Sequence, residues 1–467
     1  MRLLFAASEV VPYSKTGGLA DVAGALPRAL AARGHEVVVV TPWYAELGGE
    51  AAPLWIGDVP VPFDGGFEPV GVGTLEADGV RYLFVGHADF RRDGLYGHPD
   101  DVRRFCRFVR AVPAVCDRVG FRPDLAHVHD WHAAYLPAVL KYGWHLPDGW
   151  PGLPSVLTIH NLQHQGVSEL DATIHWLRLP REVRATGMQH FGTANAMQAG
   201  LDLADRVTTV SPTYAREIGT VAHGHGLDGT IRHVGGKLCG ILNGIDTELW
   251  DPRTDPALPV RYGPDDAGAG KAAAAEAVRR ELNLDPGRPI LGSVGRMAEQ
   301  KGIDLLLGAV PDLMAQGWTV ALLGSGDAEL EARARTVAAA HPGRIGVRIG
   351  YDDALGRRIY AAASAFAIPS RFEPCGLTQL IAMRYGAIPV GRATGGLVDT
   401  IAPGRSGFLF TDATPQALAV ATAQAMHVLI DGSAVTLRTE GMTSDPGWER
   451  SAEAYERVYR RALEGAT

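Results

Sequence analysis

The chain has 467 residues, of which 46% are hydrophobic, and a formal net charge of -8 at pH 7. One hydrophobic core rarely organises a chain of this length, so we expect two or three domains. The acidic balance argues against a surface for nucleic acid, because phosphate-backbone binding needs clustered Lys and Arg. A neutral or polar partner fits better, and nothing in the sequence indicates the oligomeric state.

The cysteines and the hydropathy pattern bear on the compartment. Cys106, Cys116, Cys239 and Cys375 form neither a paired framework nor a metal-binding spacing, so we expect reduced thiols. No stretch reaches the ~20 apolar residues that a membrane span needs, and the first residues lack the basic flank of a signal peptide. The expectation is a cytoplasmic protein that contacts no membrane.

In the first half of the chain, short apolar runs alternate with amphipathic helical patterns. Strands are expected at 2–7, 37–41, 81–85, 125–129, 155–159 and 206–210. Helices are expected at 19–33 and 102–119, closed by Gly34 and Gly120. This βαβ alternation predicts a mostly parallel sheet.

The second half repeats the alternation. Strands are expected at 290–294, 319–323, 345–349, 365–368 and 388–390, with helices at 303–316, 328–340 and 377–385. Segment 243–266 has the Pro and Gly content of a linker, and 265–275 reads as an exposed loop or a frayed helix start. The expectation is an α/β chain with one doubly wound domain over 1–242 and another over 243–446. Ligands of such sheets bind beyond the carboxyl ends of the strands, so a site between two domains would collect loops from both.

The strongest motif is the segment 370–378, which follows the strand expected at 365–368 and opens a helix. The strand end would deliver Glu373 to a ligand, while Gly376, Leu377 and Thr378 would present free backbone N–H groups to an anion. A carboxylate beside a phosphate site indicates sugar-nucleotide chemistry. The alternative is a helix-proximal charge next to an ordinary turn.

Two further loops leave strand ends. Arg296 and Lys301 could neutralise a diphosphate leaving group, as a divalent metal does elsewhere, or could lie in a solvated loop that pairs with Glu299. Near the start of the chain, Gly17 and Gly18 allow backbone amides to approach a ligand, although a Gly-Gly turn alone is usually only a turn.

Histidines cluster at 127–132, and His160 follows a later strand. A metal site is the weaker interpretation because no Cys or distant acidic ligand accompanies them, and hydrogen bonding to sugar hydroxyls is the favoured one. The segment 224–229 matches GxGxxG but follows a helical pattern rather than a strand, and GxxxxGK[ST] is absent. NAD-dependent oxidoreductases and P-loop hydrolases are therefore disfavoured.

Taken together, the motifs resemble those of bacterial glycogen synthases and plant starch synthases, in the same order and over almost the whole chain. The segments that carry the resemblance are 15–19, 129–132, 158–162, 243–246, 295–302, 373–380 and 394–397. The resemblance implies the GT-B type of fold, in which two Rossmann-like domains face each other across a cleft. It also implies a C-terminal helix, within 447–467, that crosses back onto the first domain. No metal or other cofactor is implied.

The resemblance also implies roles for individual residues. Glu373 and His160 would act on the donor glucose, and Arg296 and Lys301 on the diphosphate. The remaining substrate-binding residues implied are Lys15, Gly17, Gly18, Asp21, Tyr96, Asp130, Asn161, Asn243, Tyr351, Cys375, Gly376, Leu377 and Thr378. Among these, Tyr351 looks like the residue that stacks on adenine.

The activity implied is retaining transfer of glucose from ADP-glucose to the non-reducing end of an α-1,4-glucan such as glycogen, with release of ADP. A same-fold enzyme that uses UDP-glucose or a small acceptor is the alternative. A non-catalytic glucan-binding protein is a third possibility, disfavoured by the presence of Glu373, Arg296 and Lys301.

Overall fold

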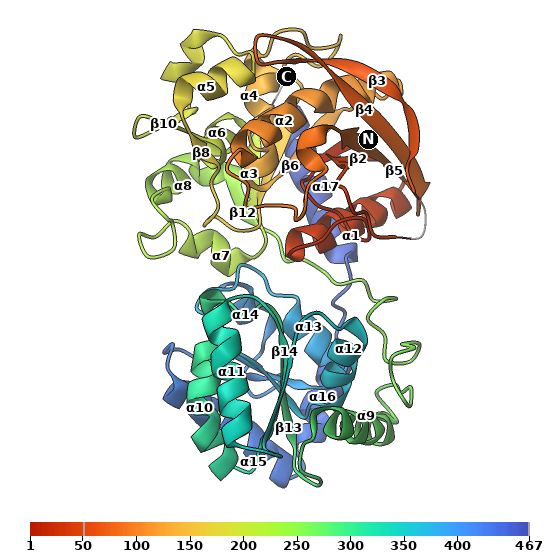
Figure 1. The fold of residues 1–467 in the computed structure, drawn as a ribbon, viewed down its shortest axis with the longest axis vertical. Coiled ribbons are helices and arrows are strands. Elements are labelled where there is room, and N and C mark those ends of the chain that lie inside the picture. The colour runs from red at the N-terminus through yellow and green to blue at the C-terminus, as the bar shows by residue number, and fades with distance from the viewer. Residues whose placement is uncertain (50–51, 466–467) are drawn as a thin grey trace. The chain divides into compact units, whose positions relative to one another are not determined.

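The computed structural model describes residues 1–49 and 52–465 (Figure 1). The chain divides into two compact units. Unit 1 consists of Met1–Gly244 together with the chain from Trp448 onward, and unit 2 of Ile245–Gly447. Each unit contains its own α/β sheet.

Unit 1 contains a nine-stranded sheet in the order β12-β11-β7-β6-β1-β2-β5-β4-β3. Its strands are β1 Arg2–Ala6, β2 Glu36–Pro42, β3 Leu54–Phe63, β4 Gly66–Ala77, β5 Val80–Gly86, β6 Leu125–His129, β7 Ser155–Ile159, β11 Arg206–Thr209 and β12 Leu238–Gly240. Pairing is parallel from β12 to β5. The central strands β1, β6 and β7 are almost wholly buried, as strands covered on both faces must be.

Helices and a small second sheet complete unit 1. The helices are α1 Gly18–Ala32, α2 Asp101–Arg118, α3 Asp130–Ala133, α4 Leu136–Tyr142, α5 Leu170–Trp176, α6 Ala196–Leu203, α7 Pro212–Glu217, α8 Asp228–Val234 and α17 Glu449–Glu464. The small sheet contains β8 Val167–Ser168, β9 Gln189–His190 and β10 Thr193–Asn195. The GxGxxG segment 224–229 lies between α7 and the start of α8, away from any strand end.

Strands β3 and β4 were not predicted from the sequence. Strand β4 pairs antiparallel with both β3 and β5. Two-residue turns join these strands: Asp64 and Gly65 have φ of 50° and 79°, and Asp78 and Gly79 have φ of 52° and 74°. Asp-Gly between alternating apolar runs is a strong signal for such hairpin turns, since both central residues need positive φ. That signal could have revealed both strands.

Helix α17 packs within unit 1, in one hydrophobic cluster with residues of β1 and α1. Tyr455 and Tyr459 on its inner face are fully buried. Beside them, Glu456 accepts hydrogen bonds from Arg33 Nε at 2.8 Å and pairs with His35 Nε2 at 3.0 Å. The Arg33 guanidinium, with His35, lowers the pKa of Glu456 to about 2. The C-terminal helix is thus held by both core packing and charge.

Unit 2 contains a fully parallel sheet in the order β15-β14-β13-β16-β17-β18. Its strands are β13 Ile290–Val294, β14 Thr319–Gly324, β15 Ile345–Ile349, β16 Ala365–Ile368, β17 Ile388–Arg392 and β18 Phe408–Phe410. The three-residue β18 was too short for the sequence analysis to find. This is the 3-2-1-4-5-6 order of doubly wound nucleotide-binding sheets, whose topological switch point lies between β13 and β16.

The helices of unit 2 are α9 Ala267–Leu282, α10 Ile303–Ala315, α11 Ala328–Ala340, α12 Asp353–Ala362, α13 Thr378–Arg384, α14 Gly395–Thr400, α15 Pro415–Ile430 and α16 Ala434–Thr443. The expectation of an exposed or frayed segment at 265–275 was wrong. Buried Lys271 fixes this part of α9 by donating to the carbonyl oxygens of Ala361, Ala363 and Tyr385.

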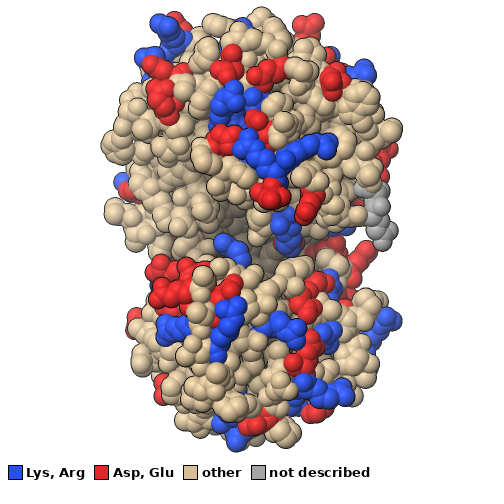
Figure 2. Space-filling view, in the orientation of Figure 1, with Lys and Arg blue, Asp and Glu red and all other residues tan. Residues whose placement is uncertain are grey.

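Basic and acidic side chains are interspersed on the face of each unit seen in Figure 2. Within the described residues, no single helix is long and apolar enough to cross a membrane, whereas α15 and α16 together meet that criterion but are bent by 102°.

Replacing Tyr455 with Ala should destabilise unit 1 by about 3–5 kcal/mol, because the change empties a fully buried aromatic position between α17 and the sheet. Chemical denaturation monitored by circular dichroism measures this loss. Arg457→Ala, at an exposed position of the same helix, is the control and should change stability by less than about 0.5 kcal/mol. Equal effects of the two substitutions would contradict a core role for this face of α17.

Candidate active site

The switch point of unit 2 brings two predicted site residues into contact. Strands β13 and β16 are adjacent and parallel, so the loops that follow them leave from the same edge of the sheet. Lys301 Nζ, from the loop after β13, donates to both carboxylate oxygens of Glu373 at 2.9 and 2.7 Å. Ser370 Oγ donates to the same carboxylate at 2.8 Å. Glu373 is only 6% exposed, so this is a buried, fully partnered carboxylate rather than a solvated charge near a helix.

Glycines allow the backbone to close tightly around Glu373. Gly302 has φ of 65°, and a Cβ there would lie 2.0 Å from the Pro369 carbonyl oxygen. Gly395 has φ of 46°, and a Cβ there would lie 1.9 Å from the Glu373 carbonyl oxygen. Gly396 N donates to that same oxygen at 3.0 Å. Any larger residue at Gly302 or Gly395 would push the loop that carries Glu373 out of place.

The loop after β13 is tied to the loop after β16 by Gln300. The side-chain Nε2 of Gln300 donates to the Phe372 carbonyl oxygen at 3.3 Å, and the main-chain carbonyl oxygen of Gln300 accepts from Arg371 N at 2.8 Å. Arg296 is exposed and donates to the Gln300 side chain at 3.2 Å. Lys301 pairs with Glu373 and not with Glu299. The carboxylate of Glu299 lies 4.0 Å from the guanidinium of Arg371 instead.

The start of α13 lies directly beyond Glu373. Gln379 Nε2 donates to the carbonyl oxygens of Cys375 and Gly376, at 3.0 and 2.7 Å, which fixes the turn into the helix. The Cys375 side chain is buried, whereas Gly376, Leu377 and Thr378 are partly exposed. First-turn N–H groups have no acceptor within their own helix, so this turn suits an anion.

Tyr351 lies between β15 and α12, at the same sheet edge. Its side chain is 87% exposed, and this aromatic surface is open to a planar ligand.

In unit 1, the loop after β1 organises the segment 15–21. Glu9 accepts hydrogen bonds from Thr16 N at 2.5 Å and Thr16 Oγ1 at 2.8 Å, and Lys15 pairs with Asp21 at 2.7 Å. Burial raises the pKa of Glu9 to about 7 and also raises that of Asp21. Glu9 was not among the residues predicted from the sequence, although its place shortly after the first strand meets the same strand-end rule that selected Glu373.

Tyr96 is held at the same strand end. Its hydroxyl hydrogen-bonds Ser8 Oγ at 2.7 Å, and its ring stacks on His132 with centroids 4.6 Å apart. Since Ser8 and Glu9 are consecutive, the end of β1 connects Tyr96 with the Lys15 loop.

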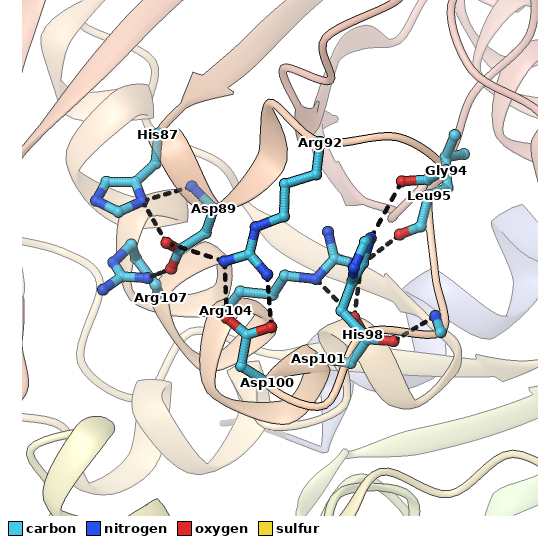
Figure 3. Close-up of polar contacts among 11 residues, drawn as sticks. His87, Asp89, Arg92, Gly94, Leu95, His98, Asp100, Asp101, Arg104 and Arg107 are labelled. Atoms are coloured by element: carbon cyan, nitrogen blue, oxygen red, sulfur yellow. Dashed lines mark hydrogen bonds and ion pairs between the residues drawn. The ribbon is translucent and has the colours of Figure 1, made fainter.

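Arginines secure the loop that carries Tyr96 (Figure 3). Arg92 pairs with Asp100 through two hydrogen bonds of 2.6 and 2.8 Å. Arg104, fully buried on α2, donates to Asp101 at 2.7 Å and to the Leu95 carbonyl. These contacts fix the loop on both sides of Tyr96.

Asp130 and His160 meet at the ends of the neighbouring strands β6 and β7. Asp130 Oδ1 accepts hydrogen bonds from His160 N at 2.7 Å and Asn161 N at 3.3 Å. Its backbone has φ of 54°, a left-handed conformation that is strained for a residue other than glycine. Burial raises the pKa of Asp130 to about 7 and lowers that of His160 to about 3.

Two of the clustered histidines, His127 and His129, face the interior of unit 1. His127 and His129 are fully buried. His127 hydrogen-bonds Tyr459 and Thr158, at 2.9 and 2.6 Å, and His129 hydrogen-bonds His160 at 2.9 Å. In the part of the chain that the structure describes, no group of three or more His, Cys, Asp or Glu side chains could hold a metal ion.

Asn243 is the last of the residues expected to contact the sugar. It lies near the end of the segment Met1–Gly244 of unit 1 and is 8% exposed. Its Oδ1 is buried and accepts no hydrogen bond from residues 1–49 or 52–465. An unpartnered buried acceptor is costly, so this oxygen fits a hydroxyl group supplied by a ligand.

These features define a class: a two-domain enzyme with a parallel α/β sheet in each unit and charged loops at the strand ends. Residues 2–233 match the starch synthase catalytic domain family, and residues 288–427 match glycosyl transferases group 1. The catalytic domain of starch synthase IV from Arabidopsis thaliana, solved with ADP and acarbose, superposes with a TM-score of 0.92 at 32% identity over 99% of both chains. The fold is therefore that of a GT-B glycosyltransferase.

Proteins named glycogen synthase are similar along the whole chain. The one from Deinococcus radiodurans is 47% identical over 98% of this chain and 100% of its own length. One from Thermus thermophilus is 42% identical over 99% of this chain and 100% of its own. Sucrose-phosphate synthase from Thermosynechococcus elongatus shares the fold, with a TM-score of 0.64 at 20% identity over 99% of both chains.

This chain belongs to the glycogen and starch synthase family. It is an enzyme of glucosyl transfer, and the family and fold inferred from its motifs are confirmed.

The raised pKa of Glu9 and Asp130 makes stability depend on pH. Between their ordinary pKa near 4 and the folded value of about 7, the folded state binds more protons than the unfolded state. Stability should therefore fall as pH rises from about 4 to about 7, by up to about 1.4 kcal/mol per pH unit for each group.

Urea denaturation of wild type and Glu9→Gln at pH 5, 6 and 7 tests this dependence. The stability difference between the two proteins should shift in favour of the variant as pH rises. The exposed Glu329→Gln is the matched control, expected to show no trend. A difference for Glu9→Gln that stays constant with pH would contradict the raised pKa.

Proposed function

We propose that this enzyme transfers glucose from ADP-glucose to the non-reducing end of an α-1,4-glucan, with retention of configuration and release of ADP. The observation that carries the proposal is the buried Glu373 carboxylate, paired with Lys301 at the switch point of a nucleotide-binding sheet. The similarity to proteins named glycogen synthase, and to a starch synthase solved with ADP and acarbose, supports this choice of donor and acceptor.

Unit 2 would bind the nucleotide. Tyr351 offers an exposed ring for adenine, and Arg296 and Lys301 supply positive charge for the diphosphate. The first turn of α13, from Gly376 to Thr378, would add backbone N–H donors. Because two cations and a helix start can neutralise the departing diphosphate, the reaction needs no divalent metal.

Unit 1 would serve the sugar and the acceptor. Lys15, Asp21 and the Gly17–Gly18 turn would contact the donor from a loop that Glu9 holds in place. The residues proposed to surround the glucose and the glucan end are Tyr96, Asp130, His160, Asn161 and Asn243. Asp130 has a positioning part here, because its carboxylate fixes the backbone of His160 and Asn161.

The chemical step would be a displacement on one face of the sugar. The bond from C1 to the phosphate oxygen breaks, the bond from C1 to the acceptor oxygen forms, and the acceptor hydroxyl proton passes to the departing diphosphate. Positive charge develops on the sugar ring in the transition state. Glu373 and the main-chain carbonyl of His160 stabilise that charge, so their contribution appears in the transition state more than in the bound substrate.

Replacing Glu373 with Ala should lower turnover by about 10²-fold or more, because it removes a group that acts on charge developing in the transition state. Glucose incorporation into glycogen measures turnover, and calorimetry measures ADP affinity, which should change little. The exposed Glu329→Gln on α11 is the matched control in the same unit and should retain full activity. More than about a tenth of wild-type turnover in Glu373→Ala would exclude this role.

A donor panel tests the nucleotide and the metal together. With glycogen as acceptor and EDTA present, wild type should use ADP-glucose in preference to UDP-glucose. Lys301→Ala should lose activity with either donor, since Lys301 provides charge that a metal would otherwise supply. Preference for UDP-glucose would support the alternative donor, and strict dependence on added Mg²⁺ would refute the metal-independent diphosphate site.

A further inference from the structure

His129 lies directly behind His160. It is the last residue of β6 and is paired in register with Thr158 of the neighbouring β7, so its ring reaches the residue that follows β7. His129 Nδ1 and His160 Nε2 are 2.9 Å apart, a hydrogen bond between two ring nitrogens. The ring of His129 also stacks on Phe5, with centroids 5.5 Å apart and planes inclined by 19°. The orientation of His129 is therefore fixed from the sheet.

Both rings are neutral in the folded protein. Burial lowers the pKa of His129 well below its usual range and that of His160 to about 3. In a neutral ring one nitrogen carries a proton and the other accepts. Either His129 Nδ1–H donates to His160 Nε2, or His160 Nε2–H donates to His129 Nδ1.

The surroundings of His129 distinguish these two arrangements. His129 Nε2 is buried and has no hydrogen-bond partner among the described residues. If His160 donated, this orphaned nitrogen would carry the proton of His129. Buried N–H groups without an acceptor are rarer than buried acceptors without a donor, so the proton of His129 belongs on Nδ1.

We propose that His129 is a positioning residue that holds the ring of His160 and keeps it in the tautomer with its proton on Nδ1. Asp130, the next residue, holds the backbone N–H of His160 at 2.7 Å. Two consecutive residues at the end of β6 thus fix both the ring and the main chain of His160.

This arrangement gives His160 a defined polarity toward a sugar. With the proton on Nδ1 the His160 ring is a hydrogen-bond donor on that nitrogen, while the main-chain carbonyl oxygen of the same residue is an acceptor. A hydroxyl group can accept from one and donate to the other. The role in catalysis rests on the proposed glucosyl transfer, whereas the tautomer does not.

The tautomer can be measured without substrate. Long-range ¹H–¹⁵N correlation spectra of the full chain labelled with ¹⁵N-histidine identify the protonated nitrogen of each ring, and His160→Asn and His129→Asn assign the signals by their loss. We expect Nδ1–H for both residues in the wild type. A proton on Nε2 of His160 would overturn the proposal, whatever the activity.

Kinetics test the positioning role with two substitutions at His129. His129→Leu removes the donor, and His129→Asn places an amide N–H close to the position of Nδ1. With ADP-glucose and glycogen, kcat should fall about tenfold in the Leu variant, which corresponds to an activation free energy higher by ~1.4 kcal/mol. The KM for ADP-glucose should stay within about twofold of the wild-type value. The Asn variant should recover most of this loss, and equal losses in both would show a merely structural role.

Tyr459→Phe is the matched control. It removes the hydroxyl that bonds the adjacent His127 in the same buried cluster and does not touch His129 or His160. It should lower thermal stability slightly and leave both kcat and the His160 tautomer unchanged. A change of the His160 tautomer in this variant would overturn the assignment to His129. If the Leu variant does not fold, the wild-type spectrum and the Asn variant still decide the proposal.

Discussion

Parallel strand pairing is the constraint on which the candidate residues of each unit depend. When parallel strands lie side by side, their carboxyl ends share an edge, and the loops that follow them are brought together whatever their separation in sequence. Lys301 and Glu373 are 72 residues apart, yet both oxygens of the carboxylate lie within 2.9 Å of the ammonium. Asp130 and His160 meet in the same way after β6 and β7.

Burial is what gives the polar groups at these edges their properties. A buried charge is tolerated when it is paired and hydrogen-bonded, and Glu373 has Lys301 and Ser370 as partners. Where no cation is available, desolvation favours the neutral form instead. It raises the pKa of Glu9 and Asp130 to about 7 and lowers that of His160 to about 3. Unit 2 thus presents a paired ionic group at its sheet edge, whereas unit 1 combines the Lys15–Asp21 ion pair with a neutral His160 and carboxyls whose pKa is raised.

Local chemistry in the sequence made much of the fold predictable. The central strands are continuous apolar runs, because both faces of a parallel sheet are covered, and such runs are visible without a structure. The β3–β4 hairpin was not predicted because its strands are partly exposed and do not form continuous apolar runs. The Asp64-Gly65 pair is nevertheless a sequence signal for the turn that joins them. Segment 265–275 was misread because Ala and Gly gave no amphipathic pattern. Helix α9 packs there through Ala274, Val278 and Leu282, and its buried Lys271 donates to three carbonyl oxygens on distant segments.

The sequence by itself determined the fold class, the family and the residue types at the strand ends, because each depends on short motifs and periodic apolar patterns. Only the tertiary structure decided which partner each polar group takes. Lys301 could have paired with nearby Glu299 and instead pairs with Glu373, and the clustered histidines turn inward to Tyr459, Thr158 and His160. The physical reason is that hydrogen bonds and burial are set by neighbours in space. Those neighbours come from strands whose order in the sheet no local pattern specifies.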